Sequence, residues 1–408
     1  MGFAIIGNGV AGNTAALALS RIAAGIPIDL YAAEPHPYYP RPLLPEFIAG
    51  EMDRERLYFK PASWYAERGI TLHLGRTVTG LEPKEHRLRL ADGEIASYDR
   101  LLVATGGHAW IPPIEGAGKP GVFSLRTLED ALAIAERACL ARRAIVIGCG
   151  LLGLETGRAL QALGLGVSMI EFMPRLLPRQ LDAEGAEVLQ RLIEGPEVRL
   201  VLNAAAETVL GTGEAEGLRL KDGREFEADL ILVSAGMRSN TELAQLAGLE
   251  INRGVAVDRH MRTSAKDVYA AGDVAGFEGR VYGIVPAAIA QARVAAANMA
   301  GNESVTYAGT LPSTTLKVTG IDLTSLGTIV PEDGREGEYR ELRYSDLDRG
   351  VYRKLVLKGG SIVGAILLGD KASVQPVTKL IDQEVDVSEH ADSLLDLGFD
   401  LSGLLHQT

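Results

Sequence analysis

The chain has 408 residues, 47% of them hydrophobic, and a formal net charge of −12. This length predicts two or three domains with large buried cores, and the negative charge argues against a general nucleic-acid binder or a binder of anionic membranes. We find no secretory leader at the N-terminus and no apolar run long enough to span a bilayer, which predicts a cytoplasmic protein.

The first predicted element is a buried strand at residues 3–6 that runs into a glycine-rich turn and then a helix from about residue 10 to 24. In such a turn the backbone can approach a pyrophosphate, and the helix N-terminus supplies free N–H groups. A second apolar run ends in Glu34, roughly 20 residues further on, where an acid accepts hydrogen bonds from a ribose. This combination predicts a dinucleotide site rather than a bare turn. The glycines of the turn are Gly7, Gly9 and Gly12.

A stiff loop, a hairpin and a third strand are predicted before residue 108. Residues 38–42 read Tyr-Tyr-Pro-Arg-Pro, which is either a surface turn or a loop that holds Arg41 near a bound cofactor. The pair at positions 92–93, Asp-Gly, lies between two short apolar segments and predicts a hairpin. The buried strand at 101–107 ends in small residues, so a ligand can come close to its backbone.

The same order of elements begins again at residue 144. A buried strand leads into a second glycine turn, a helix follows to about residue 163, and another strand ends in Glu171, again roughly 20 residues after the turn. A hairpin at 218–223 and a strand at 230–236 complete the unit. One long unit therefore occurs twice, which predicts two dinucleotide-binding domains of similar build. The glycines of the second turn are Gly148, Gly150 and Gly153.

The last part of the chain carries one further marker and a different kind of region. A buried strand that starts at residue 268 ends in Gly272, and Asp273 lies where the strand becomes a loop. A helix of small residues follows over 287–299, a pattern that suits packing beside a cofactor as well as ordinary helix–sheet packing. From about residue 306 the pattern predicts the strands of a small α+β domain. The tail after residue 380 carries seven acids and an apolar side, which could dock on this protein or on a partner.

With both glycine turns and Asp273 in place, the sequence resembles the pyridine-nucleotide-dependent flavoprotein reductases, which hold FAD and NAD(P)H in two dinucleotide domains. The resemblance covers nearly the whole chain. Three segments are similar to NADH:rubredoxin oxidoreductases and to the flavin region of NAD(P)H nitrite reductases, namely residues 41–46, 316–322 and 364–370. Ferredoxin reductases of aromatic dioxygenase systems usually have a lysine at the position of Glu46, so they match less well.

The resemblance implies an α/β fold with two Rossmann-like dinucleotide-binding domains and a C-terminal α+β domain. A discontinuous FAD-binding domain would comprise residues 1–110 and 239–305. The NAD-binding domain would comprise residues 111–238, and the C-terminal domain residues 306–408. We expect the two nucleotides to lie end to end, so that their reactive rings meet.

The resemblance also implies which residues bind the two cofactors. The FAD pyrophosphate would lie at Gly7, Gly9 and Gly12, its adenosine ribose at Glu34 and its ribityl chain at Asp273. Further FAD contacts would come from Val10, Ala11, Arg41, Pro42, Val78, Thr105, Gly106, Pro286 and Ala287. NAD would be held by Gly148, Gly150, Leu151, Leu152, Gly153, Glu171 and Gly236.

Glu155 and Lys317 are expected near the reacting rings, and a third residue, Glu171, is expected to decide between NADH and NADPH. Glu155, one helix step after the second glycine turn, would lie near the nicotinamide–flavin contact. Lys317 either approaches the flavin ring, where its charge would favour the anionic reduced form, or is an exposed strand lysine. Glu171 predicts NADH over NADPH, because a carboxylate hydrogen-bonds a 2′-hydroxyl and repels a 2′-phosphate. Arg175 and Arg179 are close enough in sequence to leave NADPH open.

The cysteines decide the type of reaction. Cys139 and Cys149 are the only two, which excludes a disulfide framework and a four-thiolate metal or iron–sulfur site. Disulfide reductases of this family carry a redox cysteine pair near the first flavin helix, and its peroxidases and water-forming oxidases carry one cysteine there. We therefore expect direct hydride transfer from NADH to flavin, with both cysteines buried as structural residues.

Three functions remain open. The first is an NADH-dependent reductase of a small iron–sulfur electron carrier, rubredoxin-like first and ferredoxin-like second. The second is an NADH oxidase or diaphorase that reduces oxygen or small acceptors. The third is a flavin-binding electron-transfer subunit of a larger complex, attached through the acidic tail. An acidic carrier would need a local basic patch on this acidic chain. None of the three functions predicts an oligomeric state.

Overall fold

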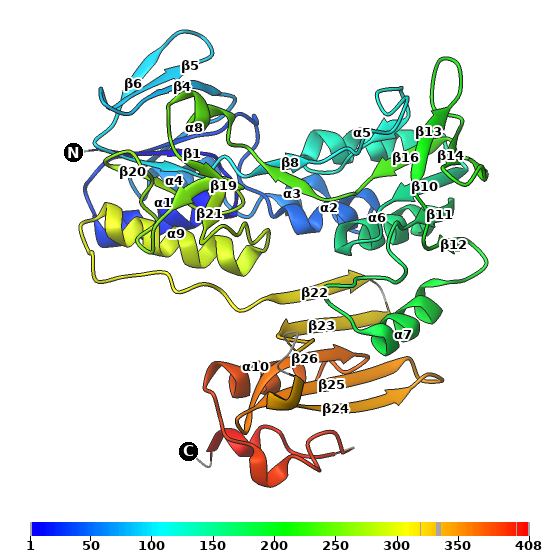
Figure 1. The fold of residues 1–408 in the computed structure, drawn as a ribbon. Coiled ribbons are helices and arrows are strands. Elements are labelled where there is room, and N and C mark those ends of the chain that lie inside the picture. The colour runs from blue at the N-terminus through cyan, green and yellow to red at the C-terminus, as the bar shows by residue number, and fades with distance from the viewer. Residues whose placement is uncertain (1, 319, 332–335, 397, 407–408) are drawn as a thin grey trace. The chain divides into compact units, whose positions relative to one another are not determined.

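The computed structural model describes residues 2–318, 320–331, 336–396 and 398–406. The chain divides into two compact units, each coherent by itself (Figure 1). Unit 1 comprises Met1–Trp110 and Met237–Thr310, and unit 2 comprises Ile111–Gly236 and Leu311–Thr408. The region expected to bind NAD and the expected C-terminal domain thus belong to one compact unit.

The core of unit 1 is a parallel sheet in the order β20-β7-β1-β2-β3. All four residues of the central strand β1 are apolar and buried, as expected for a parallel sheet covered on both faces. Because the strands are parallel, the glycine turn, Glu34 and Asp273 follow strand ends at the same edge of the sheet. The strands are β1 (Phe3–Ile6), β2 (Ile28–Tyr31), β3 (Ile70–His73), β7 (Arg100–Val103) and β20 (Val268–Ala270).

Two alanine-rich helices of unit 1, α1 (Val10–Ile22) and α9 (Val285–Met299), lie side by side (Figure 1). Their contact is made by small side chains that exclude water completely, including Ala15, Ala16 and Ala292. Small residues at the contact let the two backbones come close together. The N-terminal ends of both helices are therefore held in one packed layer.

Unit 1 also has two small sheets and one two-stranded ribbon. The predicted hairpin at 92–93 is confirmed, since β5 and β6 pair there in antiparallel fashion. The ribbon joins β8 to β17, so the chain leaves unit 1 and returns to it along neighbouring strands. The strands are β4 (Val78–Glu82), β5 (Arg87–Leu90), β6 (Ile95–Ser97), β8 (Gly107–Ala109), β17 (Met237–Ser239), β18 (Ile251–Asn252), β19 (Gly254–Val257) and β21 (Ala275–Phe277).

Unit 2 repeats the plan of unit 1, which confirms the prediction of a duplicated dinucleotide-binding fold. Its parallel sheet has the order β9-β16-β10-β11-β12, with a glycine turn after the central strand and a three-stranded antiparallel sheet, β13-β14-β15, attached. The strands are β9 (Val122–Phe123), β10 (Arg143–Ile147), β11 (Gly166–Ile170), β12 (Val198–Val201), β13 (Ala206–Leu210), β14 (Gly217–Leu220), β15 (Glu225–Glu227) and β16 (Leu230–Val233). The helices are α5 (Leu128–Ala138), α6 (Leu151–Ala162) and α7 (Ala183–Ile193).

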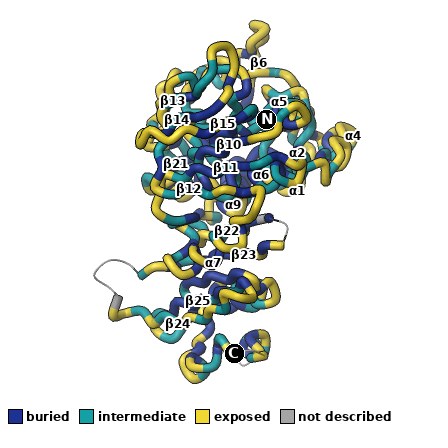
Figure 2. Tube along the Cα trace, turned by 90° about the vertical axis from the view of Figure 1, so that its right-hand side faces the viewer, coloured by how far each residue is buried: buried dark blue, intermediate teal, exposed yellow. Residues whose placement is uncertain are grey.

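The C-terminal part of unit 2 is an antiparallel sheet in the order β22-β23-β26-β25-β24, with β25 buried along much of its length (Figure 2). Its strands are β22 (Ser313–Val318), β23 (Ile321–Gly327), β24 (Tyr339–Asp346), β25 (Val351–Lys358) and β26 (Ser361–Leu368). Helix α10 (Val374–Asp382) and the tail cover this sheet. The tail packs on its own protein, because its apolar residues Val385, Val387, Ala391, Leu394, Leu401 and Leu404 share one buried core with the sheet.

A buried charged cluster fastens α7 to β25 within unit 2. The Nζ atom of Lys354 lies 3.2 Å from Asp182 Oδ2 and 2.9 Å from Glu341 Oε1, and its side chain is only 2% exposed. Asp182 also accepts a hydrogen bond of 2.7 Å from the Tyr352 hydroxyl and caps α7 by accepting from Gly185 N. One carboxylate thus caps the N-terminus of α7 and pairs with the buried lysine of the neighbouring sheet.

Short helices complete the chain. The α-helical ones are α2 (Leu44–Ile48), α3 (Arg54–Leu57), α4 (Ala62–Ala66) and α8 (Glu242–Leu246). The 3₁₀ turns are η1 (Arg41–Leu43), η2 (Glu336–Glu338), η3 (Ser388–His390) and η4 (Gly403–His406). Within the described ranges, every helix is too short or too polar to cross a lipid bilayer.

Candidate cofactor sites

The glycine turn of unit 1 is built so that only glycine fits at two of its positions. Gly7 has φ +111° and its amide donates to Tyr31 O at 2.8 Å, which holds the turn against β2. A Cβ atom on Gly7 would lie 2.1 Å from Ala104 O, and one on Gly12 would lie 1.8 Å from Gly7 O. These contacts are far below van der Waals separation, so the turn packs tightly against β7 and against its own helix.

Gly9, unlike Gly7 and Gly12, faces open space, and this space shows whether a pyrophosphate would fit at the turn. It is the N-cap of α1, and a Cβ atom on it would meet no protein atom within 4 Å. The open space lies at a helix N-terminus, where unpaired N–H groups and the helix dipole favour an anion. The turn is thus packed on the protein side and open on the side where phosphates would bind.

The glycine turn of unit 2 has the same geometry. Gly148 has φ +96° and its amide donates to Ile170 O at 2.8 Å. A Cβ atom on Gly153 would lie 2.0 Å from Gly148 O, whereas one on Gly150, the N-cap of α6, would meet nothing within 4 Å. Leu151 and Leu152 are the first two residues of α6. Both units therefore present an open, glycine-lined helix N-terminus that fits a dinucleotide.

Glu34 is held in place by two residues of the stiff loop. Arg41 Nη2 lies 2.8 Å from Glu34 Oε1, and the Tyr39 hydroxyl donates to the other carboxylate oxygen. Burial alone would lower the pKa of Arg41, but the neighbouring carboxylate and Tyr39 raise it overall. Arg41 and Pro42 start η1, so the loop braces the acid at the end of β2 rather than lying free on the surface.

The second acid, Glu171, is oriented by backbone N–H groups. Its Oε2 atom accepts from Cys149 N at 2.7 Å, inside the glycine turn, and its Oε1 atom accepts from Met173 N at 2.8 Å. The carboxylate therefore lies against the turn at the sheet edge. Each of its oxygens retains a further lone pair that a ribose hydroxyl could use.

The other expected FAD contacts surround the same sheet edge in unit 1. Thr105 donates its hydroxyl to Asn240 O at 2.9 Å, and Asn240 Nδ2 donates back to Thr105 O at 2.8 Å. This reciprocal pair braces the start of the β8–β17 ribbon beside Gly106, which has φ +68°. The Thr105 hydroxyl thus has a structural partner already, and this partner lies 135 positions away in the sequence.

Asp273 and the start of α9 lie at the neighbouring strand end. Asp273 follows Gly272, whose amide donates to the buried Gln291 Oε1 at 2.9 Å. The backbone carbonyl of Asp273 accepts from the Ser239 hydroxyl at 2.6 Å. The exposed Pro286 and the buried Ala287 lie in the first turn of α9. Ala11, in the first turn of α1, is buried, and Val10 begins that helix.

Four further expected residues lie as follows. Glu155 is in α6, part-exposed, one turn after the glycine turn, and Val78 begins β4 in unit 1. Gly236 follows β16 with φ +116° and open space where a Cβ would be. The backbone of Lys317 pairs with Asp322 between β22 and β23, and its side chain lies outside the described residues.

The structure corrects one expectation about the cysteines. Cys149 is buried, and burial, together with Glu171, raises the pKa of its thiol far above the usual range. Cys139, however, is exposed at the C-terminus of α5, because the helix ends there on the surface. Neither lies in unit 1, where the flavin is expected.

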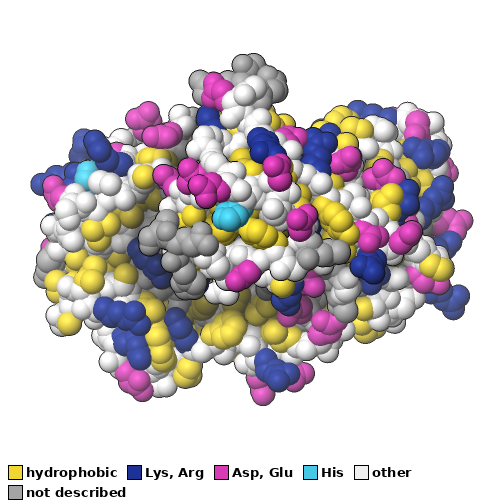
Figure 3. All heavy atoms as spheres, turned by 90° about the horizontal axis from the view of Figure 1, so that it is seen from below, with side chains coloured by type: hydrophobic (Ala, Val, Ile, Leu, Met, Phe, Trp, Pro, Cys, Tyr) yellow, Lys and Arg dark blue, Asp and Glu magenta, His cyan; other side chains and the backbone are white. Residues whose placement is uncertain are grey.

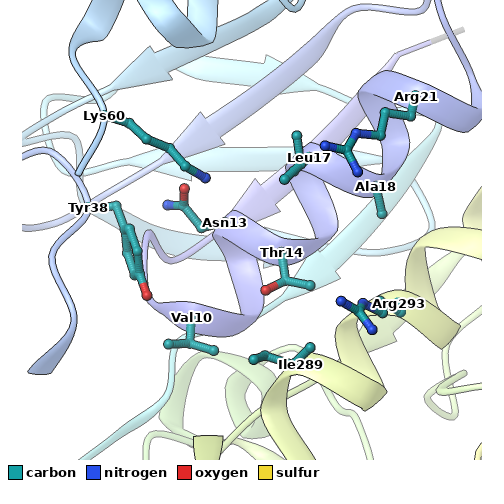
Figure 4. A pocket seen from close by; sticks show the side chains of 10 residues that line it. All are labelled: Val10, Asn13, Thr14, Leu17, Ala18, Arg21, Tyr38, Lys60, Ile289 and Arg293. Carbon is teal, nitrogen blue, oxygen red and sulfur yellow. The ribbon is translucent and has the colours of Figure 1, made fainter. Parts of the chain in front are cut away.

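A positively charged pocket of about 240 Å³ lies between α1 and α9 of unit 1 (Figure 4). Arg21 comes from α1, Arg293 from α9 and Lys60 from the segment before α4, and all three side chains line it. Burial lowers the pKa of Lys60, and the charges of Arg68 and Arg21 lower it further. Among the described residues that line this pocket, none is acidic.

The sequence gives no sign of this pocket, because its cations come from three distant segments. A single arginine on an alanine-rich helix, as in the 287–299 pattern, gives no signal of a cluster. Only the packing of α1 against α9 brings Arg21 near Arg293. The signal that could have found it is the spacing of the two arginines, each about two turns or more from its helix N-terminus.

Comparison with known proteins supplies the family. The model of the pyridine nucleotide-disulphide oxidoreductase family matches residues 1–296, and that of the rubredoxin NAD⁺ reductase C-terminal domain matches residues 312–385. The chain belongs to the pyridine nucleotide-disulphide oxidoreductase family. This family implies FAD and NAD(P)H as cofactors, and the second match identifies a C-terminal domain of the rubredoxin reductase type.

Individual members of the family resemble the chain over most of its length. The NAD(P)H nitrite reductase of Bacillus subtilis is 37% identical over 94% of this chain, which spans only 48% of that protein. The chain therefore covers about half the length of this relative. A putidaredoxin reductase, crystallised in covalent complex with putidaredoxin, superposes with a TM-score of 0.88 at 26% identity, covering 99% of this chain and 98% of the other. The NADH:rubredoxin oxidoreductase of Clostridium acetobutylicum superposes with a TM-score of 0.76 at 28% identity, covering 94% of this chain and 95% of the other.

Proposed function

We propose that this flavoprotein takes electrons from NADH and passes them to a small acidic iron–sulfur carrier, rubredoxin-like or ferredoxin-like, without a redox disulfide. FAD, when bound, supplies the chemistry, since it accepts a hydride from NADH and releases electrons to an acceptor. The protein's own residues bind, orient and shield the two nucleotides. The proposal rests above all on the basic pocket of unit 1.

The pocket is built on the two helices that also carry the proposed FAD contacts. The N-terminus of α1 forms the first glycine turn, and the N-terminus of α9 carries Pro286 and Ala287. Arg21 and Arg293 lie further along the same helices, with Lys60 beside them. An acidic carrier docked on these cations would therefore lie on the unit that holds the flavin, where complementary charge favours rapid encounter.

The geometry of the two glycine turns supports the following roles at the nucleotide sites. We assign the FAD phosphates to the open face of the first glycine turn and the FAD ribose to Glu34, which Arg41 and Tyr39 hold in place. We assign the NADH phosphates to the second turn and its adenosine ribose to Glu171. The carboxylate of Glu171 would repel a 2′-phosphate, which supports NADH over NADPH.

The sequence of unit 1 supports direct transfer from flavin to carrier. Unit 1 contains no cysteine at any of its positions, so no thiol can relay electrons there. Two similar solved structures, a putidaredoxin reductase–putidaredoxin complex and an NADH:rubredoxin oxidoreductase, support a small electron-carrier protein as acceptor.

Rapid mixing of the FAD-loaded protein with NADH tests the first half of the proposal. We expect the flavin absorbance to bleach within one turnover, and steady-state rates to be higher with rubredoxin or ferredoxin than with oxygen. Oxygen reduction as fast as reduction of any carrier would instead indicate an NADH oxidase or diaphorase. A flavin that NADH does not bleach would contradict both enzymatic functions.

One observation favours a second candidate, an electron-transfer module of a larger protein. The nitrite reductase of Bacillus subtilis contains a region similar to this chain in less than half of its length. In that case the acceptor would be a further domain or subunit rather than a freely diffusing carrier. Fast bleaching by NADH combined with slow reduction of every soluble carrier would support this candidate.

A further inference from the structure

The strand end beside Glu171 presents a large apolar ring to solvent. Phe172 is 72% exposed, and the next residue, Met173, is 40% exposed. A single exposed apolar side chain is by itself common on protein surfaces, so the position of this ring is what matters. Here the ring follows directly on the acid to which the proposed function assigns the adenosine ribose.

The backbone that carries this ring is held by hydrogen bonds on both sides. Glu171 N donates to Val201 O at 2.8 Å, and Ala204 N donates to Glu171 O at 2.9 Å. Asn203 N donates to Met173 O at 3.2 Å, while Met173 N itself donates to the Glu171 carboxylate. The backbone of this segment is thus anchored to β12 and to the residues that follow it.

The corresponding position of unit 1 differs in kind. There the acid, Glu34, is followed by Pro35 and then by His36, whose ring stacks on Tyr58 with centroids 6.2 Å apart. The two units share the turn, the strand and the acid, but only unit 2 has a free-standing phenyl ring next to the acid. The ring is therefore not a requirement of the shared fold.

We infer that Phe172 is a stacking platform for the adenine base of NADH. A dinucleotide whose phosphates lie at the N-terminus of α6 and whose ribose binds Glu171 has its base beyond that acid, and Phe172 is the next side chain there. Stacking on a base would remove the exposed face of the ring from water. This inference rests on the proposed binding of NADH in unit 2.

Binding of nucleotide fragments to the FAD-loaded protein tests the platform. We use ADP-ribose, which contains the adenine, and nicotinamide mononucleotide, which lacks it, both measured by calorimetry. Loading with FAD keeps ADP-ribose out of the first site. Phe172→Ala should raise the Kd of ADP-ribose about five- to tenfold, the low end for loss of a base-stacking ring, and leave nicotinamide mononucleotide unchanged.

Two further variants keep the test sharp. Phe172→Trp should retain wild-type affinity for ADP-ribose and add a tryptophan fluorescence that saturating ADP-ribose quenches, because the sequence has only Trp64 and Trp110, both in unit 1. Leu140→Ala, which removes a side chain 79% exposed in the same unit, should change neither affinity.

An unchanged Kd for ADP-ribose in Phe172→Ala would overturn the inference, as would an equal loss for both fragments. These results are independent of electron transfer. If NADH bleaches the flavin of the wild type but Phe172→Ala binds ADP-ribose normally, the platform is wrong and the proposed function stands. If Phe172→Ala weakens ADP-ribose alone while NADH bleaches no flavin, the proposed function is wrong and the platform stands.

Discussion

At the scale of single residues, the carboxylate of Glu171 is fixed by two backbone N–H donors, one from the glycine turn and one from its own loop. A carboxylate held by two backbone donors cannot easily turn away from an approaching nucleotide. Its negative charge should therefore act on any group at the 2′ position of the ribose.

Glu171→Gln tests this charge. Loss of a hydrogen bond to a charged acceptor should weaken NADH by about 1.5–3 kcal/mol, while NADPH should bind no worse, because the repulsion of its 2′-phosphate disappears. The ratio of the Kd for NADPH to the Kd for NADH, measured by titration, should fall at least about tenfold. Glu225→Ala, which removes an exposed acid in β15, serves as control. An unchanged ratio would mean that the acid does not touch the ribose.

The glycines of the first turn can be separated by substitution. Gly12→Ala places a methyl group 1.8 Å from Gly7 O, so it should destabilise the protein and abolish FAD binding together. Gly9→Ala meets no protein atom within 4 Å, so the melting temperature of the apoprotein should stay unchanged. Its methyl group should nevertheless crowd a bound pyrophosphate and raise the Kd of FAD about tenfold or more. Normal FAD affinity in Gly9→Ala would argue against phosphates at this turn.

At the scale of elements, α7 and β25 are joined by the buried lysine cluster. Burial alone would raise the pKa of Asp182, but the Tyr352 hydroxyl, Gly185 N and Lys354 lower it overall. Burial likewise would raise the pKa of Glu341, and hydrogen bonds from Lys354 and Arg343 lower it overall. Burial and the adjacent Asp182 raise the pKa of Tyr352, which therefore remains a donor. The junction thus depends on two ionised acids.

The pKa shifts of Asp182 and Glu341 fix how the free energy of unfolding depends on pH. Both acids have lower pKa values in the folded protein than in the unfolded chain, where Asp and Glu titrate near about 4. The stability that they contribute is therefore complete above that pH and is lost as the pH falls through the folded-state values. Lys354→Met should raise both pKa values, because it leaves two acids without their shared cation.

We expect Lys354→Met to lower the free energy of unfolding by about 3–5 kcal/mol near neutral pH. Acid denaturation, followed by circular dichroism, should begin at a higher pH than in the wild type. Lys371→Met, at a lysine that is 82% exposed, should leave both measurements unchanged. A wild-type acid transition in Lys354→Met would show that the cluster contributes nothing to stability.

The sequence indicated the parallel sheets well because their signals are local. A run of apolar residues before Gly7 or Gly148 and an acid about 20 residues later are patterns that one segment carries by itself. The β8–β17 ribbon was missed, since each strand has three residues and its partner lies more than a hundred positions away. The outer strand β24 was missed as well, because its charged, half-exposed residues show little apolar pattern.

Parts of the site escaped prediction for a similar reason. The bracing of Glu34 by Tyr39, the bond between Thr105 and Asn240, and the basic pocket all join distant segments. Burial is equally a property of the fold, so neither the buried Lys354 nor the exposed Cys139 could be read from their neighbours in sequence. The glycines could be predicted because only glycine combines a positive φ with the close backbone approach that such a turn requires.

At the scale of the whole molecule, charge is acidic on average and mixed locally. The net charge is −12, and on the face that Figure 3 shows, acidic and basic side chains alternate in small groups. The basic pocket departs from this pattern, because its described lining includes Arg21, Lys60 and Arg293 and no acid. An acidic carrier would feel general repulsion at long range and attraction close to the pocket.

The net negative charge and the basic pocket act in opposite directions, which predicts that the kcat/KM for the carrier passes through a maximum as salt increases. At about 0.01 M salt the screening length is about 30 Å, so the net charge acts, whereas at about 0.1 M it is about 10 Å and the pocket dominates. The kcat/KM for the carrier should rise and then fall as salt increases. Arg293→Gln should lower it several-fold at about 0.1 M and flatten the falling limb, while ferricyanide reduction stays unchanged.

Arg349→Gln, at an arginine that is 73% exposed in unit 2, is the matched control and should not affect the salt profile. A rate that is independent of salt in the wild type, or an identical profile in Arg293→Gln, would mean that the carrier docks elsewhere or carries no acidic surface.

The β8–β17 ribbon has a consequence for how such a protein could change over generations. Because the chain departs and comes back on adjacent strands, residues 111–236 form a cassette with both ends at one place, which a genetic exchange could replace without cutting the rest of unit 1. The cassette is not independent, however, since Asp182 belongs to it and Lys354 does not. A transplanted cassette would have to arrive with its own C-terminal sheet, so coenzyme preference and that sheet should be inherited together.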